Sequence, residues 1–437
     1  MDRIFNWVKR ERNYVFLLLF AGLVIRIFYV WLAGGVLPWT DMQRYDEARL
    51  AILHGQKYAA DWPPLYPLFL AAVSFLFGES HLPLYIAQAV LSALTCLFIY
   101  LIADRTFGKT AGLLSLVISC FYVDMVWYPA VLLAETLGLL LLCAVVYLLL
   151  DRRSPVLAGI LFGLTCLTKG VYLITFPGLL LWLMLRPGKK EAAAAVLKFT
   201  AFTFLTIAPW TVRNYYEYKG FVLLAPQDGP SIFLGHNPSA TGGADFFFVN
   251  KDYGKWFTDD SISVVEKGRI AKKMALEYAL SHPLREAQLF FLKLSKYWSL
   301  RTHFDINNGP YPLKTPFFFL SIITHIFLFP ACFLGAVFSL KDKNAFISTI
   351  IISVNTLAFT TLFFASGRMR YQLAPFIIIL ASYGLRILPE IAGKLRGPAA
   401  GGISKKLAAA AALTFLLYAN FIYQVIEKHK DIANRFQ

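Results

Sequence analysis

Apolar segments of about twenty residues, separated by short charged links, recur along the whole sequence. A helix needs about 20 apolar residues to cross the ~30 Å hydrocarbon core of a bilayer. The chain is accordingly 58% hydrophobic and only 16% charged, unlike a soluble domain. The pattern predicts an all-α polytopic membrane protein with about 11 transmembrane helices, at 14–36, 83–103, 111–127, 130–150, 155–168, 170–185, 193–212, 314–340, 345–364, 371–388 and 406–424.

Two apolar stretches need separate treatment. The first run, from Tyr14 to about Leu37, is too long for the core of a signal peptide and has no cleavage site after it, so we expect a retained helix. The stretch Pro63–Phe77 opens with two prolines and has only about 15 residues. It is expected to be a re-entrant or interfacial helix that does not span.

Basic residues give the chain a formal net charge of +16. They lie in short links between apolar runs, which is the pattern of membrane topology, so a nucleic-acid partner is excluded. With the N-terminus in the cytoplasm of a cell (inner) membrane, five links fall inside together: Arg105/Lys109, Arg152/Arg153, Arg186/Lys189/Lys190, Lys341/Lys343 and Arg386 to Lys406. All five satisfy the positive-inside rule.

The same topology puts a long polar segment, 213–312, outside the cytoplasm. Its first part is rich in turn residues, among them Gly229 and Gly235, which favours short strands and loops. Residues 261–281 and 284–299 have helical patterns. We expect a mixed extracytoplasmic insert. The predicted units are an N-terminal bundle with its first outer loop, the insert, and the C-terminal helices, at 1–212 (loop 37–82), 213–312 and 313–437.

No cofactor is required by any pattern in the chain. There is neither a phosphate-binding loop nor a glycine-rich dinucleotide turn after a strand. The cysteines lie in or beside apolar runs without metal-ligand spacing, so we interpret them as small buried hydrophobes: Cys96, Cys120, Cys143, Cys166 and Cys332.

Acidic residues stand where the chain meets the outer face. Asp41 and Asp46 follow the first helix within Asp41-Met42-Gln43-Arg44-Tyr45-Asp46-Glu47, and Glu135 lies near the outer end of the fourth helix. Ionisable groups at or within the membrane are costly to keep and indicate a functional site. The alternatives are a solvated loop for the first two and a structural interhelical hydrogen bond for Glu135.

Cations occur on the same side, against the positive-inside bias: Arg44, Lys169, Arg213, Arg368 and Arg370. An arginine fork binds phosphate oxygens with two parallel hydrogen bonds, so a substrate phosphate at the interface explains them. Attraction of any one of them to anionic headgroups is the alternative. Acids and cations at one face suggest that one carboxylate takes a proton from an acceptor hydroxyl while the cations stabilise a phosphate leaving group.

Four stretches resemble the GT-C superfamily of polyprenyl-phosphate-sugar-dependent glycosyltransferases, in the bacterial branch related to protein O-mannosyltransferases and lipid A aminoarabinose transferases. They are Asp41-Met42-Gln43-Arg44-Tyr45 with Trp62 to Pro67, Ala134-Glu135-Thr136-Leu137, Gly163 to Lys169 with Ala208 to Tyr215 and Gly235-His236-Asn237-Pro238, and Arg368-Met369-Arg370-Tyr371.

The resemblance implies an inverting transfer, with Asp41 as base, Asp46 as its competitor and Glu135 as the second acid. Arg44 and Arg370 match the family's donor-phosphate positions. The family's first-loop lysine is absent, and Lys169 or an arginine then takes over its contact. Asp61 and His236 are the candidate ligands for a divalent metal, although two separated ligands are few.

We therefore predict a glycosyltransferase that moves a sugar from a polyprenyl-phosphate donor to an outer-face acceptor, with membrane lipids around it. Lipid, polysaccharide and protein all remain open as acceptors, and the sugar is not readable from the sequence. A lipid-linked sugar transporter or flippase and a non-catalytic scaffold are the alternatives. Transporters often have repeated halves and helices broken at the midplane of the membrane. This sequence shows neither pattern, which argues against the transporter.

Overall fold

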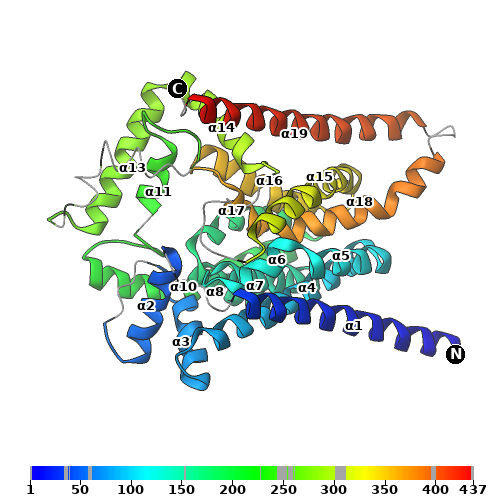
Figure 1. Ribbon diagram of the computed structural model, residues 1–437, viewed down its shortest axis with the longest axis horizontal. Coiled ribbons are helices and arrows are strands. Elements are labelled where there is room, and N and C mark those ends of the chain that lie inside the picture. The colour runs from blue at the N-terminus through cyan, green and yellow to red at the C-terminus, as the bar shows by residue number, and fades with distance from the viewer. Residues whose placement is uncertain are drawn as a thin grey trace.

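Long helices run side by side along most of the molecule, and shorter ones gather at one end, around α2, α11 and α13 (Figure 1). The structure, a computed structural model, describes residues 2–33, 38, 40–57, 62–151, 154–226, 228–243, 253, 259, 261–300, 312–394 and 400–434. The end with the short helices lies opposite the N-terminus (Figure 1). We call it the outer end.

Six helical segments among the described residues are long and apolar enough to cross a membrane, or up to seven if a bent pair counts as one span. They make the chain a multi-pass membrane protein. The helices that carry the six are α1 (Asp2–Ala33), α4 (His81–Phe107), α10 (Lys189–Tyr218), α15 (Lys314–Ser339), α17 with α18 (Gly367–Arg370, Ala374–Lys394) and α19 (Ala400–Asn434).

The predicted count of about 11 spans is not confirmed, because several predicted spans form helices too short for the test. Length decides this: 14 residues at 1.5 Å each give only about 21 Å. The shorter elements of the bundle are α5 (Lys109–Phe121), α6 (Val123–Trp127), α7 (Glu135–Asp151), α8 (Pro155–Thr168), η2 (Gly170–Thr175), α9 (Phe176–Met184) and α16 (Phe346–Thr361).

The segment 111–127, predicted as one span, is broken at Tyr122, and the pair Lys109–Phe121 and Val123–Ala130 bends by 54°. A buried arginine supports the break. Arg26 of α1 is 0% exposed and donates to the carbonyl oxygens of Ser119 (3.0 Å) and Cys120 (2.9 Å) at the end of α5. It thereby satisfies carbonyl groups that a helix end leaves free, with its charge at the negative end of the helix dipole.

The insert is helical in its described part, so the expected short strands are a wrong prediction there. It contains α11 (Asp228–Gly235), α13 (Val264–Ser281) and α14 (Pro283–Tyr297). Gly229, which the sequence suggested as a turn residue, lies inside α11, and a Cβ on it would be 2.2 Å from the carbonyl oxygen of Gly268. The glycine serves close helix packing instead of a turn.

Two further helices lie in the segment predicted as the first outer loop: α2 (Asp41–Leu53) and α3 (Leu65–Phe77). At 13 residues, α3 is shorter than the roughly 20 residues that a span needs. The five cysteines are all free and buried, which confirms their interpretation as small buried hydrophobes.

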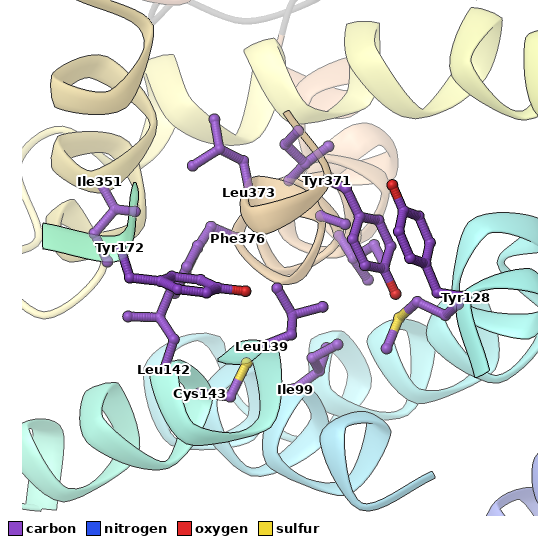
Figure 2. Packing of buried hydrophobic residues seen from close by; sticks show 14 of the residues in the cluster. Ile99, Tyr128, Leu139, Leu142, Cys143, Tyr172, Ile351, Tyr371, Leu373 and Phe376 are labelled. Carbon is purple, nitrogen blue, oxygen red and sulfur yellow. The ribbon is translucent and has the colours of Figure 1, made fainter. Parts of the chain in front are cut away.

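Three buried tyrosines lie among the apolar side chains of the core: Tyr128, Tyr172 and Tyr371 (Figure 2). Tyr128 of η1 (Tyr128–Ala130) stacks on Tyr371 of η3 (Tyr371–Leu373), with ring centroids 3.7 Å apart and planes at 9°. Tyr172 of η2 is also buried, and its hydroxyl donates to the carbonyl oxygen of Glu135 at 3.3 Å. These contacts fix the short segments next to the acidic and basic side chains described below.

Candidate functional site

Glu135 is the first residue of α7 and is held by two cations. Its Oε1 atom accepts hydrogen bonds from Lys169 Nζ and from Arg368 Nε, both at 2.8 Å. The side chain of Glu135 is 6% exposed, so its charge is supported by these partners and not by water. Its other oxygen, Oε2, is buried without a hydrogen-bond partner among the described residues.

Asp41 is the first residue of α2, where the helix dipole favours a carboxylate. Its Oδ2 atom accepts a hydrogen bond from Arg368 Nη1 at 2.8 Å. The side chain of Asp41 is 34% exposed, against 19% for Arg368. Asp41 is therefore the carboxylate of this cluster that a substrate reaches most easily.

One guanidinium thus bridges two acids that are far apart in sequence. Arg368 lies in α17, and its planar fork donates to Glu135 with one nitrogen and to Asp41 with another, a geometry that a lysine cannot reproduce. We call Asp41, Glu135, Lys169 and Arg368 the outer charge cluster. Its two acids and two cations balance formally, so a phosphate that enters requires further positive charge.

Arg44 can supply that charge. It is exposed on α2, three residues after Asp41 and hence about one helical turn away on the same side. Arg213 lies elsewhere, near the end of α10, with its guanidinium 5.0 Å from the Trp210 ring centroid and 3.9 Å from Glu217 Oε2.

Asp46 belongs to a separate group of residues. Its carboxylate contacts Arg49 at 2.7 Å and His81 at 3.0 Å, and Arg49 also donates to Ser74 Oγ at 2.8 Å. Burial would raise the pKa of Asp46, but His81 and Arg49 hold it below its ordinary value. These contacts connect α2 to α3 and α4, whereas Asp41 is part of the outer charge cluster.

Arg370 points away from the outer charge cluster. It is 4% exposed, donates to the carbonyl oxygen of Ser299 at 2.6 Å and lies 4.9 Å from the centroid of the Phe329 ring. Two residues on a helical turn project about 200° apart, so Arg368 and Arg370 face opposite sides. The guanidinium of Arg370 lies at the C-terminal end of α14, where the last carbonyl groups of the helix need hydrogen-bond donors.

Of the two residues predicted to bind a metal, only His236 belongs to the described part of the chain. Asp61 lies outside the described residues. His236 uses both ring nitrogens: Nδ1 contacts Glu286 Oε2 at 2.8 Å, and Nε2 contacts Lys293 Nζ at 3.0 Å. An ammonium at Nε2 repels a divalent cation, and the described part of the chain contains no group of three or more His, Cys, Asp or Glu side chains with metal-ligand geometry.

Sequence reasoning missed several partners that the structure supplies. Tyr128 is 1% exposed, its hydroxyl is buried without a hydrogen-bond partner among the described residues, and its ring stacks on Tyr371. Nothing in the sequence marks this tyrosine among the 22 in the chain. Arg26 had a signal, since it is a lone charge within the first apolar run.

The fold is similar to that of an oligosaccharyltransferase of known structure. The apo oligosaccharyltransferase of Archaeoglobus fulgidus shares 16% identity over 94% of this chain with a TM-score of 0.55. Its complex with an inhibitory peptide and a dolichol-phosphate gives 15%, 94% and 0.54. In both cases this chain spans 55% of the other protein's length, and at this identity the likeness establishes the fold alone.

Residues 61–212 match the family model described as dolichyl-phosphate-mannose-protein mannosyltransferase. With the shared fold, this match confirms the predicted resemblance to the GT-C superfamily and its protein mannosyltransferase relatives. ArnT from Cupriavidus metallidurans bound to undecaprenyl phosphate also matches, with 15% identity over 88% of this chain and 81% of its own length, at a TM-score of 0.39, too low to support an argument. No curated protein matches in sequence.

Proposed function

We propose that this protein is a GT-C glycosyltransferase that moves a sugar from a polyprenyl-phosphate donor to a hydroxyl of an outer-face acceptor. The observation that carries the proposal is the single guanidinium of Arg368 between Asp41 and Glu135. It joins a partly exposed carboxylate to a largely buried acid that a second cation, Lys169, also contacts. The solved oligosaccharyltransferase complex with a dolichol-phosphate, and the description of the matching family, support a lipid-linked donor.

The reaction is an inverting displacement. Asp41 accepts the proton of the acceptor hydroxyl, the acceptor oxygen forms the new bond to the anomeric carbon, and the bond from that carbon to the phosphate oxygen breaks. The polyprenyl phosphate leaves with the bonding electrons. Arg44, together with Arg368 and Lys169, stabilises the negative charge that develops on it.

The roles of the two acids differ because their surroundings differ. Glu135 is almost fully buried and forms ion pairs with both Lys169 and Arg368. It therefore orients these two cations and does not exchange protons with the acceptor. Asp41 has one cationic partner and a partly exposed side chain. We assign the base to Asp41 and leave Asp46 to its contacts with Arg49 and His81.

The positive-inside pattern supports a cell (inner) membrane location with the N-terminus in the cytoplasm and the outer charge cluster outside it. The acceptor is a lipid, a glycan or a protein. The insert helices α11 and α13 lie at the same end of the molecule as α2 (Figure 1), which begins with Asp41, and this supports a part for the insert in acceptor selection.

Mass spectrometry of envelope glycans and lipid-linked sugars, from cells with and without the protein, identifies the product. Asp41→Asn should then reduce its formation by several orders of magnitude at unchanged protein level. Glu47→Gln is the matched control, because Glu47 is exposed on the same helix and accepts a hydrogen bond from the exposed Gln43. A normal rate in Asp41→Asn would exclude Asp41 as the base and make Asp46→Asn the next variant.

A further inference from the structure

Helix α14 has two faces with different partners. On the inner face, Glu286 and Lys293, seven residues apart, both contact His236, and Leu289 between them is 0% exposed. This face fixes α14 to the end of α11. The other face carries Phe291, which is 67% exposed among the described residues.

The face of α14 that carries Phe291 also contacts helix α19. Ser295 and Asn420 form the crossing, where Asn420 Nδ2 donates to the carbonyl oxygen of Ser295 at 3.0 Å. Gln424, one turn later on α19, donates to the same carbonyl oxygen at 2.8 Å. Figure 1 shows α14 beside the C-terminal part of α19. The two helices therefore hold a fixed angle at this point.

A groove of about 530 Å³ opens beside the crossing. It is lined by Arg285, Gln288, Phe291, Leu292, Ser295 and Tyr423. Five of these residues come from one face of α14, and the sixth comes from the last turn of the candidate span Lys405–Ile426. Tyrosines concentrate at the boundary between hydrocarbon and headgroups, so Tyr423 puts the groove at that depth.

The apolar wall of the groove is continuous with a surface that faces lipid. Only 11% of the most apolar window of the Lys405–Ile426 span is buried inside the molecule. Two side chains of this span, Phe415 and Ile422, are 71% and 58% exposed. A span with so little protein cover is surrounded by acyl chains. The occupant of the groove therefore reaches it from the bilayer.

The other end of the groove is polar and carries a cation. Arg285 donates to the carbonyl oxygen of Ala240 at 3.0 Å and to Gln288 Oε1 at 3.2 Å. These two bonds hold the guanidinium in place and use two of its five N–H groups. A guanidinium so oriented, about ten residues or ~15 Å along the helix from the crossing, suits a phosphate at headgroup depth.

We propose that the groove between α14 and α19 is a binding site for an anionic glycerophospholipid of the outer leaflet. The headgroup phosphate contacts Arg285 and Gln288, and the acyl chains lie along Phe291, Leu292 and Tyr423. The site is separate from the outer charge cluster and goes beyond the proposed function, since it binds a resident lipid and not a substrate.

Native mass spectrometry tests the site on the full chain, released from nanodiscs of phosphatidylcholine that contain increasing phosphatidylglycerol. The wild type should retain phosphatidylglycerol in preference to phosphatidylcholine, and Arg285→Gln should lower that retention by about fivefold, as loss of a partly exposed ion pair implies. Arg269→Gln is the matched control, because Arg269 lies exposed on α13 and contacts Glu266.

A second variant covers the apolar part of the site. Phe291→Ser changes an exposed side chain, so folding should be preserved, and it should also weaken retention of phosphatidylglycerol. Equal retention in wild type and Arg285→Gln, or no preference over phosphatidylcholine, would overturn the proposal. So would a photoreactive amino acid at position 291 that captures a protein or a second copy of this chain instead of a lipid.

Discussion

Replacement of Arg368 by lysine keeps a positive charge but removes the fork that joins the two acids. Arg368 makes two charge-assisted hydrogen bonds, to Glu135 and to Asp41, each at 2.8 Å. A lysine is a point charge that can keep one of these geometries. A hydrogen bond to a charged group contributes about 1.5–3 kcal/mol, and its loss in the transition state lowers the rate by about 10- to 150-fold.

Arg368→Met should lose more, because Asp41 then has no cation and Glu135 keeps only Lys169. The assay is the initial rate of product formation in membranes, normalised to folded protein, after the product has been identified by mass spectrometry. Arg370→Lys is the informative comparison. Arg370 donates to the carbonyl oxygens of Tyr297 and Ser299, so its replacement should lower the yield of folded protein and leave the rate per folded molecule unchanged.

The reasoning fails if Arg368→Lys and Arg368→Met both transfer sugar at the wild-type rate. It also fails if the two variants lose folded protein in proportion to activity, since Arg368 would then act as Arg370 does. A loss of rate in Arg370→Lys at full yield would show that the assignment of the two arginines is reversed.

The remaining predictions concern stability. Arg26→Met should destabilise the bundle by several kcal/mol, because the hydrogen bonds to Ser119 and Cys120 are both lost and each buried acceptor left without a donor costs about 1–3 kcal/mol. Thermal unfolding in detergent measures this loss. An unchanged melting temperature would contradict the role of Arg26 at the break. His236 should make the protein sensitive to acid: burial, and then the charge of Lys293, lower its pKa from 6.5, against the opposing effect of Glu286. The unfolded chain then binds the proton more readily, so stability decreases as the pH falls below about 6.5, and the melting temperature should drop further between pH 7 and pH 5 in the wild type than in His236→Gln. Equal drops in the two proteins would contradict this pH effect.

Much of the outer charge cluster was visible in the sequence. Asp41, Glu135, Lys169 and Arg368 were all singled out because charged groups at the ends of apolar runs are costly, and the structure brings the four together. The prediction of which arginine faces them was the weaker part. The family resemblance favoured Arg370 for its Arg-Tyr pair, but a short helical turn sends alternate residues to opposite sides, and only packing decides which side is which.

The insert and the span count show a second limit. Gly229 and Gly235 suggested turns, yet both lie within α11, and a Cβ on Gly235 would be 2.6 Å from the carbonyl oxygen of Phe363. A glycine that permits a turn and a glycine that permits close packing look the same in one sequence. Likewise, apolar character continues through Tyr122, where the helix breaks, because hydropathy reports the solvent around a segment and not its straightness.

The sequence by itself determined the environment of this chain: long apolar runs require lipid around them, and their charged links leave acids and cations at the ends of helices. The tertiary structure alone decided which of those charges meet. Arg368 lies 233 residues from Glu135 and 327 from Asp41 in sequence, and no local pattern encodes such a contact. Transfer free energies depend on each segment's own composition, whereas a hydrogen bond of 2.8 Å depends on the folding of every element between its partners.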